Sequence, residues 1–218
     1  MIADILPPGV ASAESISQEP EPIAALYPAE EELVRTAGPR RRAEFAAGRA
    51  CARAALAGLG MPAAQILAGR AGEPCWPAGV TGSITHCAGY RACVVARTAD
   101  LAALGIDAEP DAALPAGLIE SVAGRAERAW IARHASSAPE VCWDRLVFSA
   151  KEAVGKLCYP LTGQWPGAAE ITVFLDPAGG FDARVAGPGP APARLAGRWL
   201  ARRGLIVTAV TWPAAAAG

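Results

Sequence analysis

Two acidic side chains near the middle of the chain, in the stretch "GIDAEP", are spaced so that they could act together. Side chains at positions i and i+2 of a strand point to the same face, so Asp107 and Glu109 would present two carboxylates side by side. Adjacent carboxylates repel one another unless a cation or a proton lies between them. Hard oxygen ligands suit Mg²⁺ or Mn²⁺, which makes this pair a candidate metal site. The alternative is a solvated strand end whose two acids have no further role.

A second group of ionisable residues lies in "FSAKEAVGK", inside an expected helix. Glu152 and Lys156 are four residues apart, in the orientation that favours a helical salt bridge, and such a bridge alone would explain them. Lys151 lies about 100° away around the helix. If this helix packs near Asp107 and Glu109, a third acid and two lysines would complete a metal–pyrophosphate site. The acids would hold the cation and the lysines would neutralise phosphate oxygens.

Basic residues on an earlier helix give a second indication of phosphate binding. In the expected helix 39–60, Arg42, Arg49 and Arg53 fall on one side and Arg41 lies beside them. The planar guanidinium fork suits phosphate better than an ammonium does. A solvated helix face would explain the same arginines equally well.

The stretch "SITHC" places a histidine in a strong strand pattern. A lone histidine there is more often a hydrogen-bonded structural residue, but beside Thr85 the ring of His86 could donate to a phosphate. His86 with Cys87 and Cys93 would make only a partial zinc site, because the six cysteines include no CxxC pair. Buried reduced thiols are the better interpretation of the cysteines.

Composition limits the class of protein. The chain has 218 residues, 52% of them hydrophobic, and a net charge of −1, which indicates a soluble globular protein. A near-zero net charge argues against nucleic-acid binding. No stretch approaches the roughly 18 apolar residues of a membrane span. The first residues lack the pattern of a secretory signal, so a cytoplasmic protein that binds no membrane is expected.

Glycine and proline residues mark the ends of the expected helices and strands. Residues 1–27 are expected to form an extended lead-in, and 71–80 a loop. Short-range patterns predict helices over 28–38, 39–60 and 137–159 and strands over 81–87, 90–98, 101–110, 170–176, 181–187, 193–203 and 205–212. The last helix should begin with a capping box at Ser137 and end before Pro160. Both halves therefore combine a helix with antiparallel strands, which indicates two similar α+β units.

Taken in order, these motifs resemble a known family. "GIDAEP" followed by "FSAKEAVGK" resembles the paired signature of the 4′-phosphopantetheinyl transferases, and "RRRAEFAAGRACARAAL", "GEPCWP" and "GSITHC" resemble the branch associated with surfactin and enterobactin synthetases, especially its actinobacterial members. The resemblance runs from about residue 30 to residue 165. It implies two α/β subdomains related by a pseudo-two-fold axis, each a helix on a mainly antiparallel sheet. Residues 1–103 would form the nucleotide-phosphate side and 104–218 the metal and catalytic side, with the active site at their interface.

The family transfers the 4′-phosphopantetheine arm of coenzyme A to a serine of an apo acyl or peptidyl carrier protein and releases adenosine 3′,5′-bisphosphate. By resemblance, Asp107, Glu109 and Glu152 are expected to bind Mg²⁺ or Mn²⁺. Glu152 is also the expected general base, directly or through a metal-bound water, and Asp107 and Lys156 complete the catalytic set. Lys156 and Lys151 are expected to contact the pyrophosphate. The protein is expected to act as a monomer.

The resemblance also implies a binding region for the nucleotide end of coenzyme A, made by Arg41, Arg49, Arg70, Glu73, Pro74, Thr85 and His86. In this assignment His86 lies at the 3′-phosphate, and Glu73 and Pro74 border the adenine.

Three positions depart from the family pattern. Ala68 and Ala71 stand where relatives often carry lysine, so Arg70 is expected to substitute, and Gly155 stands where an aromatic residue is frequent.

Two other classes of protein remain to be weighed. A nucleotidyl or phosphoryl transferase should carry a phosphate-cradling glycine loop such as GxxxxGK[ST], which is missing from the sequence. A non-catalytic module that binds coenzyme A or carrier protein would have lost an acid or a lysine, yet all are present. The sequence does not decide whether fatty-acid, polyketide or nonribosomal-peptide carriers, including those of siderophore synthesis, are served.

Overall fold

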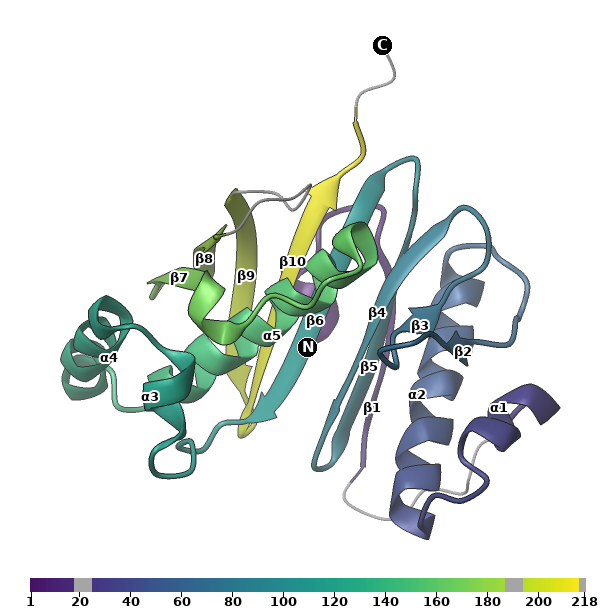
Figure 1. Cartoon of the computed structure of the whole chain (residues 1–218), viewed down its shortest axis with the longest axis horizontal. Coiled ribbons are helices and arrows are strands. Elements are labelled where there is room, and N and C mark those ends of the chain that lie inside the picture. The colour runs from purple at the N-terminus through teal and green to yellow at the C-terminus, as the bar shows by residue number, and fades with distance from the viewer. Residues whose placement is uncertain (18–24, 187–193, 216–218) are drawn as a thin grey trace.

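The computed structural model describes residues 1–17, 25–186 and 194–215 and has an α+β architecture (Figure 1). Its main sheets have the strand orders β1-β5-β4 and β6-β10-β9-β8-β7, all antiparallel, and β2 and β3 form a short ladder. The strands are β1 (Ala11–Ile16), β2 (Leu67–Ala68), β3 (Pro74–Cys75), β4 (Val80–Cys87), β5 (Tyr90–Arg97), β6 (Leu101–Pro110), β7 (Ile171–Asp176), β8 (Gly180–Val185), β9 (Arg194–Arg202) and β10 (Leu205–Pro213). The helices are η1 (Ile2–Ile5), α1 (Pro28–Leu33), α2 (Pro39–Gly58), α3 (Leu118–Val122), α4 (Arg125–Ser137), α5 (Trp143–Thr162) and η2 (Ala168–Glu170).

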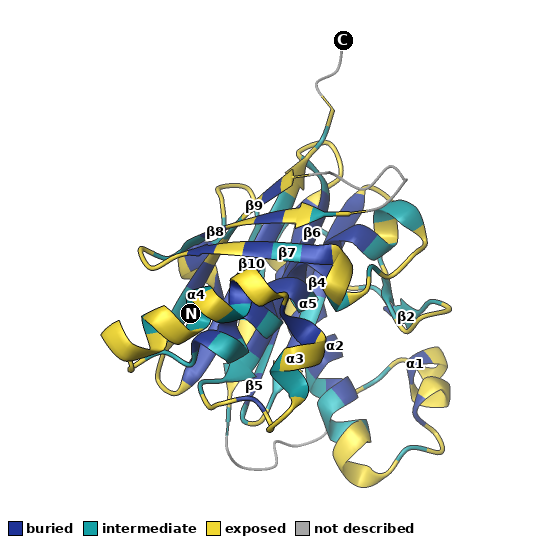
Figure 2. Ribbon diagram, turned by 60° about the vertical axis from the view of Figure 1, so that its left-hand side comes forward, coloured by how far each residue is buried: buried dark blue, intermediate teal, exposed yellow. Residues whose placement is uncertain are grey.

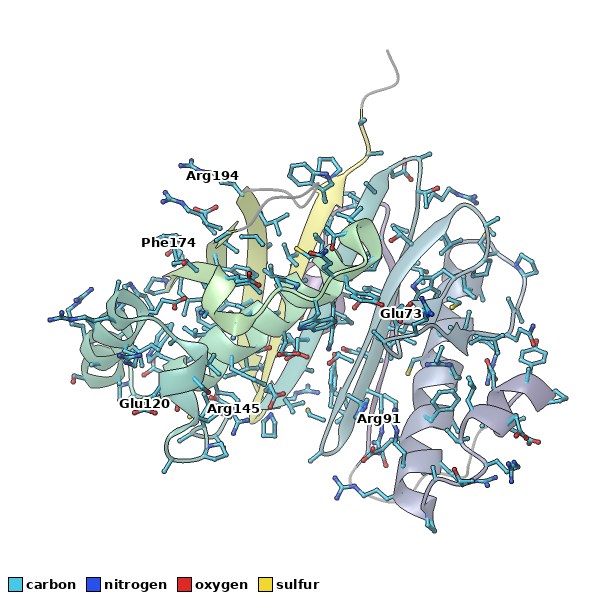
Figure 3. All side chains as sticks on the ribbon, viewed as in Figure 1. Glu73, Arg91, Glu120, Arg145, Phe174 and Arg194 are labelled. Atoms are coloured by element: carbon cyan, nitrogen blue, oxygen red, sulfur yellow. The ribbon has the colours of Figure 1, made fainter. Side chains whose placement is uncertain are left out.

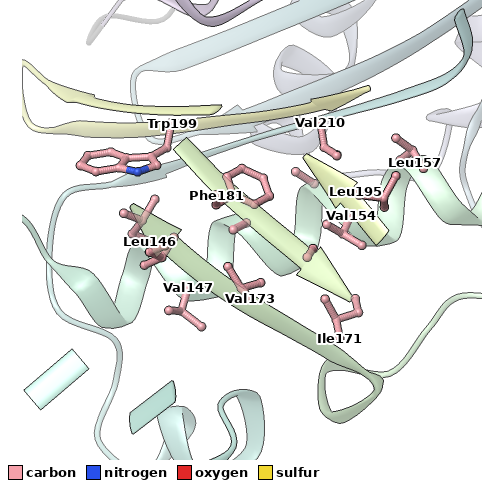
Figure 4. Close-up of a cluster of buried hydrophobic side chains, with 14 of the residues drawn as sticks. Leu146, Val147, Val154, Leu157, Ile171, Val173, Phe181, Leu195, Trp199 and Val210 are labelled. Atoms are coloured by element: carbon pink, nitrogen blue, oxygen red, sulfur yellow. The ribbon is translucent and has the colours of Figure 1, made fainter. Parts of the chain in front are cut away.

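One long helix covers each main sheet. The helix α2 packs its small side chains, among them Cys51 and Ala52, on Cys93 and Val95 of the three-stranded sheet. The helix α5 buries an apolar face on the five-stranded sheet, where Leu146 and Leu157 are fully buried (Figure 4). The central strands and α5 are mostly buried, whereas α1 and α4 are largely exposed (Figure 2). The predicted α+β class is therefore confirmed, while the division at residues 103/104 and the pseudo-two-fold axis stay predictions.

The two main sheets meet where β4 lies beside β6 (Figure 1). Two β4 hydroxyls make this junction. The backbone N–H of Ile106 donates to Ser83 Oγ at 3.2 Å, and that of Ala108 donates to Thr85 Oγ1 at 3.0 Å. Side chains of β4 thus satisfy backbone donors of β6 in place of a strand ladder. The junction places Thr85 next to the acids of β6.

The predicted extended lead-in over residues 1–27 is wrong for most of its described part. Residues of β1 pair with β5, and Ile2 and Ile5 of η1 are buried against Ile106 and Val207. The small and polar residues of β1 carry little strand propensity, so the pairing depends on the edge that β5 offers. Residues 18–24 of the lead-in lie outside the described residues.

The second half contains two helices that the sequence patterns did not predict, α3 and α4. Ser137 ends α4 and caps no new helix, and His134 of α4 stacks on Trp130 with ring centroids 3.6 Å apart. The helix α5 begins at Trp143 and continues past Pro160 to Thr162. Proline removes one helical N–H, but Gly163 caps the last turn in a left-handed conformation, with its N–H on Tyr159 O at 2.8 Å. No helix in the described ranges is both long and apolar enough to cross a membrane.

Candidate active site

The approach of α5 to β6 depends on Gly105. A Cβ atom built on Gly105 would lie 2.0 Å from the backbone oxygen of Ala153 on α5. Only glycine lets a helix backbone come this close to a strand. The contact brings the α5 turn with Glu152 and Lys156 over the β6 segment that follows Gly105, where Asp107 lies.

Gly105→Ala should therefore reduce both stability and catalytic activity. Since the added methyl group meets backbone, α5 must shift, which we expect to cost about 1–3 kcal/mol of unfolding free energy. A shift of 1 Å at reacting groups can cost about 10²-fold in rate. Thermal unfolding and the catalytic assay described below measure the two effects. The matched control is Gly58→Ala at the end of α2, where the added Cβ would meet the Ala11 side chain at an ordinary 3.5 Å. Equal behaviour of the two variants would contradict the role of Gly105.

Asp107 is the buried centre of the site, with 5% of its surface exposed. Its Oδ1 accepts hydrogen bonds from Lys156 Nζ at 2.7 Å and from Thr85 Oγ1 at 3.3 Å. Its Oδ2 is buried and has no hydrogen-bond partner among the described residues. An unpaired buried carboxylate oxygen is costly, so this atom is suited to receive a cation.

Glu109, two residues further along β6, is paired with an arginine that sequence reasoning missed. Arg145 Nη1 donates to Glu109 Oε2 at 3.0 Å, and both side chains are largely buried. Burial raises the pKa of Glu109, the charge of Asp107 raises it further, and Arg145 opposes the shift. Glu109 thus carries negative charge that its surroundings only partly compensate.

Glu152 lies on α5, near enough to Asp107 for the two charges to interact. Lys156 forms its ion pair with Asp107, and within the described ranges no hydrogen bond or ion pair joins Glu152 to Lys156. The helical salt bridge considered as a simple explanation is therefore not formed. Burial raises the pKa of Glu152, Asp107 raises it further, and Lys156 opposes the shift. A half-buried carboxylate with a raised pKa is a better proton acceptor than an exposed one.

The donor set at this site fits a hard divalent cation. The candidate ligands Asp107, Glu109 and Glu152 offer only carboxylate oxygens, and burial, followed by the charge of Asp107, raises the pKa values of both glutamates. The unpaired Oδ2 of Asp107 adds a buried acceptor with no donor. In the described part of the chain, no three His, Cys, Asp or Glu side chains already stand at metal-ligand spacing. Lysine and arginine side chains supply the positive charge at Asp107 and Glu109.

Lys151 does not join this cluster. Its Nζ donates to Glu127 Oε2 at 2.9 Å, to Val122 O at 2.7 Å and to Ala168 O at 3.0 Å, and its side chain is only 3% exposed. These partners come from α3, α4 and η2. The predicted contact of Lys151 with the pyrophosphate therefore has no support in this geometry, because all three ammonium protons already have acceptors.

The side chains of Thr85 and His86, which are consecutive residues of β4, point to opposite faces of the strand. Thr85 points to Asp107. His86 instead has its Nε2 atom 3.4 Å from Nη1 of Arg41, which lies at the start of α2. Partial burial lowers the pKa of His86, and the charges of Arg41 and Lys156 lower it further, against the opposing effect of Glu44. Arg41 carries the positive charge of this pair, which an incoming phosphate would neutralise, and the His86 ring adds a hydrogen-bonding group beside it.

Arg49 lies apart from the Arg41–His86 pair. It is buried, donates from Nε to Ile66 O at 2.7 Å and stacks on Phe45, with its guanidinium carbon 4.1 Å from the ring centroid. Its contacts stabilise the segment between α2 and β2. The predicted grip of Arg49 on the nucleotide therefore has no support in this geometry.

A pocket of about 210 Å³ lies between the β2–β3 turn and the end of α5. Glu73 (labelled in Figure 3) accepts a hydrogen bond from the N–H of Ala71 and helps to hold the turn, and Arg70 beside it is exposed. The pocket is lined by Ala71, Gly72, Glu73, Pro74, Trp76, Gly82, Ser83, Ile84, Lys156, Tyr159, Pro160 and Trp165. It therefore joins the predicted adenine-binding turn to the lysine that pairs with Asp107.

Gly155 makes room for one wall of this pocket. A Cβ atom on Gly155 would lie 2.8 Å from the ring of Trp165, which follows α5 and is 48% exposed. An indole from the loop thus occupies space beside the helix at the position where the resemblance led us to expect an aromatic side chain. Sequence reasoning missed Trp165, because no local pattern links a loop tryptophan to a helix glycine.

Comparisons with known proteins match both halves of the chain to one family. A sequence model of the 4′-phosphopantetheinyl transferase N-terminal domain matches residues 29–96, and one of the 4′-phosphopantetheinyl transferase superfamily matches residues 103–209. The chain belongs to the 4′-phosphopantetheinyl transferase family. The predicted family resemblance is therefore confirmed.

Individual members of this transferase family are similar over almost the whole chain. The chain is 48% identical to 4′-phosphopantetheinyl transferase Svp of Streptomyces mobaraensis, covering 96% of this chain and 88% of Svp. Identity is 43% to PptT of Mycobacterium tuberculosis, over 96% of this chain and 97% of PptT. It is 42% to Npt of Nocardia iowensis, over 97% and 100% respectively. The chain is thus a 4′-phosphopantetheinyl transferase of the type found in these bacteria.

Proposed function

We propose that this transferase moves the 4′-phosphopantetheine arm of coenzyme A to a serine of an apo acyl or peptidyl carrier protein at the Asp107–Glu109–Glu152–Lys156 cluster. The observation that supports this site most is the buried ion pair of Lys156 with Asp107, which leaves the Oδ2 of Asp107 without a donor. The cluster combines carboxylates for a divalent cation and a proton with a lysine for phosphate charge.

Each residue has a separate task in the proposed reaction. Glu152 accepts the proton as the carrier serine oxygen bonds to the β-phosphorus of coenzyme A. The bond from that phosphorus to the bridging oxygen breaks, and adenosine 3′,5′-bisphosphate leaves with the electron pair. Lys156 neutralises the charge that develops on the departing phosphate. Asp107, Glu109 and Glu152 would hold Mg²⁺ or Mn²⁺, which supplies further charge stabilisation when bound.

The nucleotide end of coenzyme A is assigned to β4, the start of α2 and the β2–β3 turn. Arg41 supplies positive charge and His86 a hydrogen-bond donor for the 3′-phosphate, while Thr85 contacts Asp107. Glu73 and Pro74 border the adenine in the pocket beside Lys156. We further propose that the protein acts in the cytoplasm as a monomer.

Intact-mass spectrometry of an apo carrier protein tests the proposed function. Incubation with this protein, coenzyme A and Mg²⁺ should add one phosphopantetheine, about 340 Da, and EDTA should prevent the gain. No gain with acyl and peptidyl carriers, despite coenzyme A binding, would favour a non-catalytic binding module.

His86→Ala should weaken binding of coenzyme A more than binding of 3′-dephospho-coenzyme A. The reason is that the Arg41–His86 pair loses one of its two phosphate donors, and a charge-assisted hydrogen bond contributes about 1.5–3 kcal/mol. Isothermal titration of both ligands against wild type and variant measures the difference. Equal losses for the two ligands would place His86 away from the 3′-phosphate.

A further inference from the structure

Arg145 fixes the segment that follows β6 against the start of α5. Its Nε donates to Ala112 O and its Nη2 to Ala113 O, both at 2.9 Å. The third bond, from Nη1, goes to Glu109 Oε2 at 3.0 Å. Figure 3 shows Arg145 beside the end of β6 and the start of α5. All three directions of the planar guanidinium are therefore used, which sets its orientation.

Two further hydrogen bonds hold the segment after β6 against the start of α5. The N–H of Leu114 donates to Asp144 Oδ2 at 2.9 Å, and the N–H of Cys142 donates to Asp111 Oδ1 at 2.9 Å. The side chain of Arg145 is only 16% exposed. The backbone of Ala112 and Ala113 therefore fixes the position of the guanidinium, and the guanidinium in turn fixes the position of the Glu109 carboxylate.

The pair with Arg145 occupies only one oxygen of Glu109. Among the described residues, no hydrogen bond reaches the other oxygen, Oε1. Asp107 likewise has one oxygen paired, with Lys156, and one without a donor. Each of the two β6 acids thus has one oxygen fixed by a cationic side chain and one oxygen left for a ligand.

We propose that Arg145 is a positioning residue for the divalent cation: it orients Glu109 through Oε2 and leaves Oε1 for the metal ion. The proposal rests on the proposed metal-dependent function and adds a residue to it. Carboxylates that bind metals are commonly oriented by such outer hydrogen-bonding partners, whose loss costs about 10–100-fold in metal affinity. Lysine should not replace Arg145, because the three bonds leave from three different nitrogens of the planar guanidinium, whereas all donors of an ammonium share one nitrogen.

The test is a titration of the full-length chain with Mn²⁺ in the presence of coenzyme A. The electron paramagnetic resonance signal of free Mn²⁺ reports how much of the ion is bound, and a titration of coenzyme A alone gives the amount of Mn²⁺ bound by coenzyme A, which is subtracted. Arg145→Lys and Arg145→Gln should each bind Mn²⁺ about 10–100-fold more weakly than wild type. The matched control is Arg35→Gln, which removes an exposed arginine–glutamate pair on the far segment after α1 and should leave Mn²⁺ affinity unchanged. Melting curves show whether each variant is folded. If one of the two Arg145 variants fails to fold, the Mn²⁺ affinity of the other variant tests the proposal.

The outcomes separate this inference from the proposed function. If wild type binds no Mn²⁺, the metal-dependent function fails and this inference fails with it. If wild type binds Mn²⁺ and both folded Arg145 variants bind it equally well, Arg145 has only a structural role. If they bind it more tightly, Arg145 competes with the metal for Glu109, and the proposal is overturned.

Discussion

Glu152→Gln should abolish most of the transfer to carrier protein while leaving the fold intact. A glutamine of the same shape cannot accept the serine proton, and loss of a general base costs about 10²–10⁴-fold in rate. The fold should survive because Glu152 is half-buried and makes no hydrogen bond to the described residues, so no partner is left unsatisfied. Time courses of holo-carrier formation by intact mass, with melting curves in parallel, measure the two quantities.

The matched control for this change is Glu140→Gln, an exposed glutamate shortly before α5, which should transfer at the wild-type rate. Near-wild-type turnover in Glu152→Gln would remove Glu152 from the mechanism. Recovery of the rate at high Mn²⁺ concentration would assign the loss to weakened metal binding and not to proton transfer.

Lys151→Met should unfold at much lower temperature than wild type, although Lys151 neighbours the catalytic glutamate in sequence. Glu127 would keep its buried charge but lose the ammonium that lies 2.9 Å away, and the carbonyls of Val122 and Ala168 would lose their donor. Removing one partner of a buried ion pair costs about 3–5 kcal/mol of unfolding free energy. Denaturant unfolding measures this loss.

Lys156→Met should affect the transfer rate more than the stability, the reverse of what we expect for Lys151→Met. Its side chain is 25% exposed and pairs with Asp107 at the site, so we expect a large loss of transfer rate with a smaller loss of stability than in Lys151→Met. Folded Lys151→Met protein should bind coenzyme A with nearly wild-type affinity. A stable Lys151→Met variant with weakened coenzyme A binding would instead support the predicted contact of Lys151 with the pyrophosphate.

Periodicity in the sequence determined which side chains share a face. The i, i+2 spacing of Asp107 and Glu109 and the apolar face through Leu146 and Leu157 were both predictable, because strand and helix repeats are local properties. Five motifs in family order also indicated the enzyme family. The Arg145 position could have been found from the same repeat, since it lies seven residues before Glu152 and therefore on the same side of α5.

Only the tertiary structure decided which partner each of these side chains meets. Lys156 bonds to Asp107, and Lys151 turns to Glu127, although both lysines lie within one turn of Glu152. The pairing requires α5 to approach β6 at Gly105, where a methyl group would collide with the helix backbone. Local spacing sets the direction of a side chain, but its hydrogen-bond partner, burial and pKa depend on segments that are distant in sequence and are brought together by packing of the core.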